Sequence, residues 1–172
     1  MKPITLEPRT IHIRADRRLV FQVLTAYGNM GLDGYSSKVM EDHGDRKLVE
    51  FHTPLKIRNT THVVRSVEWV KLTDPERIDF WLAEGYEDKS IFALSLLEDA
   101  FALADRDGCT EMTYESRFAV KTPVIGWLLA RLMMVPVMRR HMVDHLEDIR
   151  GLCEARAERS RVFPQVECGC EV

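Results

Sequence analysis

The chain has 172 residues, a formal net charge of −3 at pH 7 and a pI near 6.1. This length fits one domain that buries most of its apolar surface without support from disulfides or a structural metal. The acidic balance provides no basic face for a phosphate backbone, so we expect no nucleic-acid partner. Residues 1–18 contain no apolar run of the kind that a secretory signal requires, which predicts a cytoplasmic protein with reduced cysteines.

A strand and a short helix are predicted first. Between Thr10 and Arg14, polar residues alternate with Ile11 and Ile13, which is typical of a strand with one buried face. Asp16 is a candidate N-cap for the helix that follows. The apolar side of this helix consists of Leu19, Val20, Val23, Leu24 and Tyr27. The glycine-rich residues 28–35 then predict a loop or a broken second helix.

Six further strands, separated by turn signals such as Thr53-Pro54, are predicted before the chain becomes helical again. They are Ser37–Asp42, Arg46–His52, Ile57–Val70, Glu76–Ala83, Lys89–Leu97 and Cys109–Val120. In the last strand, one face carries Met112, Tyr114, Ser116, Phe118 and Val120. The other face carries mostly charged residues. The short turns predict that consecutive strands are antiparallel neighbours. The apolar face of such a sheet must be covered by another element of the domain.

A long amphipathic helix is predicted from Thr122 to about Glu158. At 100° per residue, its apolar stripe contains Val124, Trp127, Arg131, Met134, Val135, Met138, Met142, His145, Ile149 and Cys153. Pro136 lies inside this pattern, so we expect a kink there. The apolar part, residues 124–138, is shorter than the roughly 20 residues that span a bilayer. A buried helix, or one that makes transient contact with a membrane, is therefore predicted.

Together these elements predict an α+β domain over residues 1–158. A curved antiparallel sheet of about seven strands wraps around the long C-terminal helix, and a short helix pair after the first strand closes one end. Residues 159–172 are predicted to form a disordered tail. Antiparallel edge strands and an exposed apolar helix start are compatible with a homodimer.

Three local stretches carry a resemblance to a known family. They are Ala15–Leu24, Leu72–Phe80 and Gly108–Tyr114. Together with the order of the elements, they resemble the START-like helix-grip superfamily (SRPBCC), which includes polyketide cyclases and lipid-transfer domains. The resemblance covers roughly Ile4 to Ala157. It implies a deep apolar cavity between sheet and helix that holds a hydrophobic or amphipathic small molecule.

Arg131 and His145 are polar residues in the apolar stripe of the predicted helix, and both are candidate ligand contacts. A buried guanidinium needs a partner, because uncompensated burial of a charge is very costly. Arg131 would then anchor a ligand carboxylate, phosphate or phenolate. Alternatively, it pairs with Glu50 or Glu68, or extends from the helix edge into water. His145 either touches the ligand or is a satisfied core histidine.

Other candidate ligand contacts are spread over strands and helix. Tyr114 presents a hydroxyl on the inward face of its strand, and Arg65 becomes a second cationic candidate if the Trp69 side of strand 57–70 faces inward. Trp127, Met138 and Phe92 are core residues that would line a pocket if a void exists. His141 and His145 could face one metal, but no motif supplies further ligands. We therefore expect no metal and no cofactor.

Two functions of different classes fit this pattern. In the first, the protein binds and carries a lipid, quinone or polyketide-like molecule, with apolar burial giving affinity and one polar contact giving orientation. In the alternative, the same cavity is a polyketide aromatase/cyclase site, where Arg131 stabilises an enolate and Tyr114, His145 or His141 moves protons. A third interpretation, a protein-interaction module, predicts a filled core without a cavity.

Overall fold

The computed structural model describes residues 3–28, 31–57, 60–86, 94–121, 128 and 130–166. The strands are β1 (Ile4–Thr5), β2 (Arg9–Ile13), β3 (Ser36–Asp42), β4 (Arg46–Ile57), β5 (Thr60–Thr73), β6 (Arg77–Leu82), β7 (Leu94–Arg106) and β8 (Cys109–Val120). The helices are α1 (Arg17–Leu24) and α3 (Val135–Arg159), and a π-helical turn at Ala130–Met134 leads into α3.

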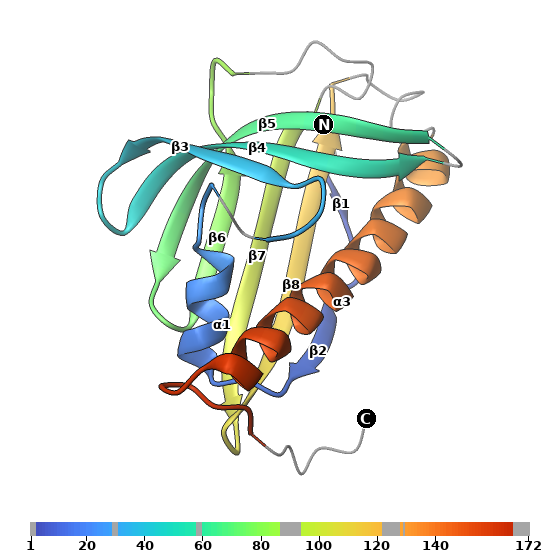
Figure 1. Ribbon diagram of the computed structural model, residues 1–172. Helices are drawn as coiled ribbons and strands as arrows, with labels where there is room; N and C mark the ends of the chain where they lie inside the picture. The colour runs from blue at the N-terminus through green and yellow to red at the C-terminus, as the bar shows by residue number, and fades with distance from the viewer. Residues whose placement is uncertain are drawn as a thin grey trace.

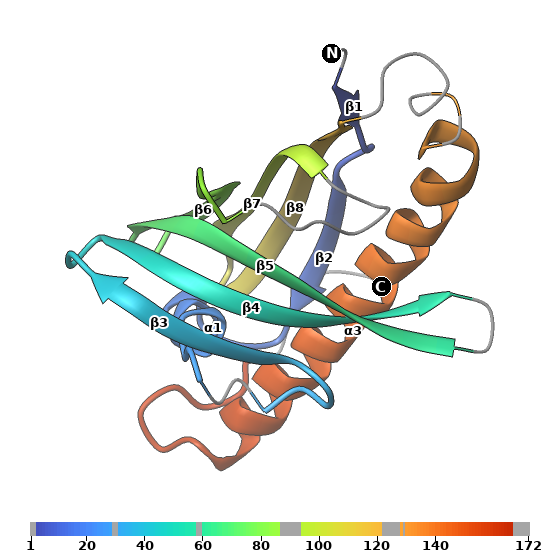
Figure 2. The same ribbon diagram turned by 90° about the horizontal axis from the view of Figure 1, so that it is seen from above.

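One curved sheet contains all eight strands, in the order β1-β8-β7-β6-β5-β4-β3, with β2 also paired to β8. All neighbouring pairs are antiparallel. Helix α3 runs along the concave side of this sheet, and α1 lies near the C-terminal part of α3 at one end (Figures 1 and 2). The predicted α+β helix-grip architecture is therefore confirmed.

The alternation of β8 determines which of its side chains face the helix. Met112, Ser116 and Phe118 are at most 4% exposed, whereas Glu115 and Arg117 lie on the opposite face. This matches the two-residue period that separates the faces of a strand. The predicted bounds, Cys109–Val120, are also those of the structure.

Helix α1 begins where its cap residue predicts. The Asp16 carboxylate accepts a hydrogen bond from the Arg18 amide at 2.7 Å, which satisfies a free N–H of the first turn. Of the predicted helix pair, the structure describes α1. Residues 31–35 lie outside any helix, and residues 29 and 30 are not among those described.

The apolar stripe of the long helix is confirmed in its C-terminal half, where Met142, Ile149 and Cys153 are buried. Pro136 does not lie in the middle of a helix as predicted. It occupies the first turn of α3, directly after the π-helical turn. A proline is tolerated in a first turn, where its missing N–H would have no intrahelical partner. Within the described residues, no helix is long and apolar enough to cross a membrane.

Two further predictions need correction. Thr53-Pro54 is not a turn, because β4 continues to Ile57. Strand β3 pairs with β4 only as far as His52, so Pro54 lies on an unpaired edge where it costs no ladder hydrogen bond on that side. Cys109, expected to be reduced, is disulfide-bonded.

Part of the predicted tail packs against the domain. After α3 ends at Arg159, the Phe163 amide donates to Ser160 Oγ at 2.9 Å, and the Phe163 ring packs against the main core. Gly108, at the β7–β8 turn, lies close to the Val166 side chain. Residues 160–166 therefore have a defined place, and residues 167–172 lie outside the described part of the chain.

Candidate ligand-binding cavity

A cavity of about 300 Å³ lies between the inner face of the sheet and α3. Much of its wall is apolar and aromatic, including Phe51, Phe80, Leu97, Phe101, Phe118 and Met138. These side chains come from five different elements, so the wall depends on the curvature of the sheet. A concave, mainly apolar site with a few polar groups is the usual form of a small-molecule site.

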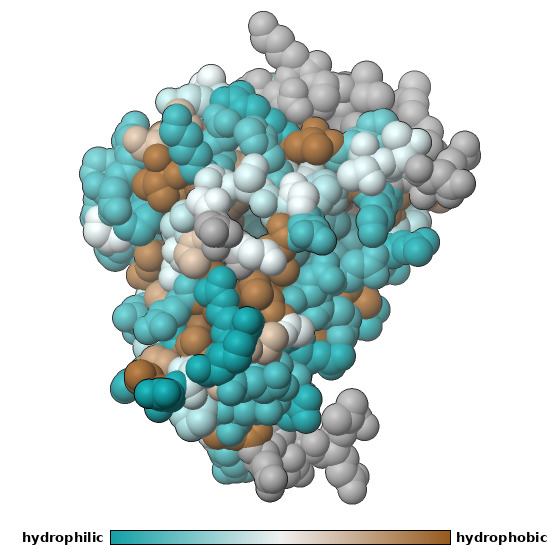
Figure 3. Space-filling view, viewed as in Figure 1, coloured by the Kyte–Doolittle hydropathy of each residue, from teal (hydrophilic) through white to brown (hydrophobic). Residues whose placement is uncertain are grey.

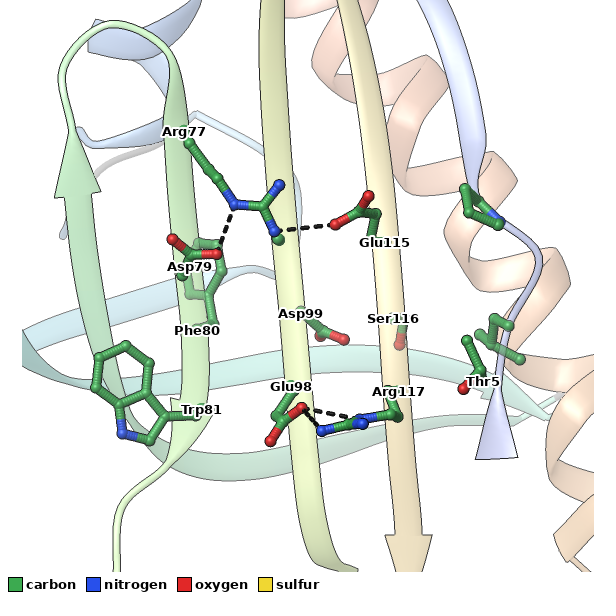
Figure 4. A pocket seen from close by; sticks show the side chains of 13 residues that line it. Thr5, Arg77, Asp79, Phe80, Trp81, Glu98, Asp99, Glu115, Ser116 and Arg117 are labelled. Atoms are coloured by element: carbon green, nitrogen blue, oxygen red, sulfur yellow. Dashed lines mark hydrogen bonds and ion pairs between the residues drawn. The ribbon is translucent and has the colours of Figure 1, made fainter. Parts of the chain in front are cut away.

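Polar side chains gather on the sheet side of this wall. Glu68 is on β5, Asp99 on β7 and Tyr114 on β8, and all three line the cavity. Ser66 donates a hydrogen bond of 2.5 Å to Glu68, and Ser116 is the cross-strand partner of Asp99. Figure 4 shows Asp99 and Ser116 on neighbouring strands. We refer to Ser66, Glu68, Asp99, Tyr114 and Ser116 as the acidic cluster.

Burial changes the protonation of the acidic cluster. Removal from water raises the pKa of Glu68 to about 7, and the nearby negative charge of Asp99 adds to this rise. Removal from water also raises the pKa of Asp99 to about 6. The Ser116 and Tyr114 hydroxyls lie near enough to offset part of this rise, although Ser116 Oγ does not reach hydrogen-bonding geometry. The pKa of the Tyr114 phenol is raised well above its usual value by burial and by Asp99. Both carboxyls therefore titrate near neutral pH.

Two atoms of the acidic cluster lack a hydrogen-bond partner among the described residues. They are Asp99 Oδ1 and Ser116 Oγ, and both are buried. Buried polar atoms in native proteins are nearly always paired, and an unpaired one costs about 1–3 kcal/mol. Asp99, which lines the cavity, is therefore suited to contact a group that enters it.

Helix α3 supplies the opposite, aromatic side of the cavity. The His145 ring stacks on Tyr35 with ring centroids 4.8 Å apart, and His141 stacks on His145 at 5.9 Å. Burial lowers the pKa of His145 to about 3, and it also lowers the pKa of His141. His145 is therefore neutral at physiological pH, and its Nδ1 has no partner among the described residues.

The structure brings three of the predicted site residues together. Tyr114, His145 and Met138 line the cavity. Arg65 also contributes to the wall, but its guanidinium bonds Glu50 at 2.5 Å and its side chain is 55% exposed. Trp127 and Phe92 lie outside the described residues.

The inward face of β5 is the one that carries Ser66 and Glu68. Trp69 faces the other way, where it packs with Leu48 and Val67 and stacks under the Arg46 guanidinium at 4.0 Å. The Trp69 side is therefore the outer face of the sheet, so Arg65 does not point inward as a buried cation.

Arg131 does not reach the cavity. It belongs to the π-helical turn, it is exposed, and it is not among the lining residues. A π-helical turn is wider than an α-helical one, so positions calculated at 100° per residue lose their phase across it. This explains why an arginine in the calculated stripe lies on the surface.

Sequence reasoning missed Asp99 and treated Glu68 only as a partner for Arg131. A signal for Asp99 is present, since it occupies an inward position between Leu97 and Phe101 on an otherwise apolar face. The signal for Glu68 is weaker, because both faces of β5 carry valines.

A second hollow, of about 480 Å³, lies on the outer face of the sheet (Figure 4). Arg77 bonds Asp79 at 2.7 Å and Glu115 at 2.9 Å, and Arg117 bonds Glu98 at 2.9 Å. These groups neutralise one another in contact with water, where such pairs contribute little. The outer hollow is therefore a weaker candidate than the inner cavity. The face that Figure 3 shows is the opposite one, on the side of α3 and β3, and it is mainly hydrophilic with scattered apolar residues.

The described residues contain no cluster of three side chains that could hold a metal ion. The polar groups that the inner cavity offers to a ligand are mainly carboxyl, hydroxyl and imidazole groups.

No protein-family model and no curated protein matches the sequence. Solved structures do match. The Zhui aromatase/cyclase from Streptomyces sp. R1128 aligns over 94% of this chain and 98% of its own, at 15% identity and a TM-score of 0.72. A protein from Thermus thermophilus aligns over 90% of this chain and 99% of its own, at 16% identity and a TM-score of 0.69. A START superfamily protein from Mycobacterium smegmatis aligns over 90% of this chain and 97% of its own, at 14% identity and a TM-score of 0.60. With its curved antiparallel sheet and long C-terminal helix, the chain has the START-like helix-grip fold.

Proposed function

We propose that the protein binds and carries a hydrophobic or amphipathic small molecule, such as a lipid, quinone or polyketide-like compound, in the inner cavity. One observation carries this proposal: a cavity of about 300 Å³ between the sheet and α3, with a largely apolar wall and a minority of polar side chains. Each buried methylene group of a ligand contributes about 0.8 kcal/mol, so an alkyl chain of moderate length is enough for useful affinity. The helix-grip fold of the similar structures is compatible with this use of the cavity.

The acidic cluster favours a second candidate, an aromatase/cyclase-type enzyme that uses the same cavity. General acid–base catalysis works best with groups whose pKa values are near the operating pH. Glu68 and Asp99, with pKa values raised to about 7 and 6, meet this condition beside Tyr114. The exposed position of Arg131 gives no support to its predicted role as enolate stabiliser.

Direct titration with a neutral probe tests the binding proposal. We expect decanol to bind the wild-type protein with one-to-one stoichiometry in isothermal titration calorimetry. Met138→Trp places a larger side chain in the wall and should weaken binding strongly. The matched control is Val143→Trp, which changes an exposed residue of the same helix and should leave binding intact. Equal affinities in all three proteins would show that decanol does not occupy this cavity.

Turnover separates the two candidate functions. A carrier returns its ligand unchanged, so mass spectrometry of a bound polyketide-like probe should show no change of mass or ring count after incubation. A cyclised or dehydrated product formed by wild type and not by Asp99→Asn would assign the protein to the enzyme class.

We also propose that the protein contacts membranes transiently. Just before α3, Leu128 and the π-helical residue Leu132 are 53% and 66% exposed. Co-sedimentation with neutral phospholipid vesicles should be reduced by Leu132→Asp. Equal co-sedimentation of the two proteins would remove this surface from the proposal.

A further inference from the structure

Among the described residues, the carboxyls that line the cavity are Glu68 and Asp99. Neither forms an ion pair with another described residue, whereas Arg65 and His52, which also line the cavity, both pair with Glu50. Arg65, the cationic side chain of the described wall, directs its guanidinium to Glu50 on the rim. His145 is neutral, because burial lowers its pKa to about 3. Among the described residues, Glu68 and Asp99 therefore offer the cavity hydrogen-bond acceptors and negative charge that no ion pair neutralises.

The unpaired atoms of the acidic cluster point to a ligand group with several donors. Asp99 lines the cavity, yet its Oδ1 is buried and has no hydrogen-bond partner among the described residues. Ser116 lies on the same inward face as Tyr114 and Phe118, which both line the cavity. An ionised carboxylate only accepts hydrogen bonds, whereas a primary ammonium donates three. Hydrogen bonds between ionised groups are also roughly twice as strong as neutral ones.

We propose that the acidic cluster binds the primary ammonium head of an amphipathic ligand, with the apolar wall holding its hydrocarbon part. The inference deepens the proposed binding function and rests on it. An anionic head, such as a fatty-acid carboxylate, is disfavoured at the same place because like charges repel in a poorly solvated site. The protein should therefore distinguish ligands of equal chain length by the charge of their head.

Protonation of the cluster provides a direct signature. Tyr114 and the α3 residues His141 and His145 line the cavity with Glu68 and Asp99, and Tyr27 lies near Glu68. His52 and Arg65 also line the cavity, and both pair with Glu50. The pKa values of Tyr27 and Tyr114 are raised and those of His141 and His145 are lowered, so these four groups stay neutral between pH 7 and 8. The two carboxyls, with pKa values of about 7 and 6, are the groups of this set that gain charge as the pH rises from 5 to 8. Affinity for an ammonium should rise over the same interval.

Three matched probes, decylamine, decanol and decanoate, test the inference by calorimetry below their aggregation limits. At pH 8, wild type should bind decylamine at least about tenfold more tightly than decanol, and decanoate most weakly. At pH 5 the preference for the amine should disappear, while decanol affinity stays constant. Glu68→Gln and Asp99→Asn should each reduce the preference at pH 8.

The matched control is Glu98→Gln. Glu98 is the neighbour of Asp99 on β7, it faces the outer side, and its replacement changes the net charge by the same amount. This variant should retain the wild-type preference. Circular dichroism of each variant shows whether it is folded. Because Glu68→Gln and Asp99→Asn are tested separately, the experiment remains informative if one of them misfolds.

The outcomes separate this inference from the binding proposal. If decanol binds and decylamine binds no more tightly, the ammonium site is refuted while the carrier function stands. Tightest binding of decanoate would also refute it. If none of the three probes binds, both proposals are overturned.

Discussion

The variant Glu68→Gln should make the protein markedly more stable at pH 8 and change its stability by only about 1 kcal/mol at pH 5. Glu68 is 7% exposed, and burial raises its pKa from 4.5 to about 7. The folded state therefore holds the proton more tightly than the unfolded chain does. A raised pKa of this kind contributes stability that is present below about pH 4.5 and is lost as the pH rises through about 7.

The size of the effect follows from the two pKa values. At about 1.4 kcal/mol for each tenfold change in proton affinity, a pKa raised from 4.5 to about 7 corresponds to about 3 kcal/mol. Glutamine has nearly the same shape and is neutral at every pH. Its side-chain oxygen can still accept the hydrogen bond from Ser66. Wild type should therefore lose about 2.5 kcal/mol relative to the variant between pH 5 and pH 8.

Urea denaturation at both pH values measures this difference. With a slope of about 1–3 kcal/mol per molar urea, the variant's midpoint at pH 8 should lie about 1 M or more above that of wild type. Glu50→Gln, which changes a rim residue bonded to Arg65, is the control and should not show this gain. If the midpoints of Glu68→Gln and wild type differ equally at pH 5 and pH 8, Glu68 is not held in a poorly solvated site.

Three further predictions concern packing, capping and the surface. Leu146→Ala should lower the free energy of unfolding by about 2–5 kcal/mol, because Leu146 is 2% exposed in the core. The control Val143→Ala, at an exposed site of the same helix, should lower it by less than about 1 kcal/mol. Equal urea midpoints for the two variants would contradict the packing of α3. Asp16→Ala should cost about 0.5–2 kcal/mol in the same assay, and no loss would mean that the cap is not formed in solution. Arg131→Ala should leave calorimetric affinities for decanol and decylamine unchanged, and a marked loss would place its guanidinium at the ligand.

Much of the fold could be predicted because its signals are local. The alternation around Tyr114 determines the inward face of β8, and Asp16 marks the start of α1. The helical spacing from Met142 to Cys153 identifies the core side of α3. Each of these patterns lies within a single element, so no knowledge of neighbouring elements is needed.

The features that sequence reasoning missed depend on which elements become neighbours. Pro54 is tolerated within β4 because the pairing with β3 stops at His52, opposite the first residue of β3. No local sequence pattern reveals where this pairing stops. The inward face of β5 is ambiguous because valines lie on both sides, and the order of the strands resolves it.

The candidate site was predicted in part for the same reason. Tyr114, Met138 and His145 follow from the faces of single elements. The raised pKa values of Glu68 and Asp99 arise only when two strands and the covering helix remove both carboxyls from water. Arg131 lies outside the cavity because the π-helical turn changes the rotation per residue before α3 begins.

Native mass spectrometry of gently purified protein tests the binding proposal most directly. After incubation with decanol or decylamine, wild type should carry one ligand per chain, and Met138→Trp should carry none under the same conditions. Solvent extraction of the purified protein would identify any molecule that it retains. A protein that carries neither an extracted molecule nor either probe would contradict the account of the cavity as a ligand-binding site.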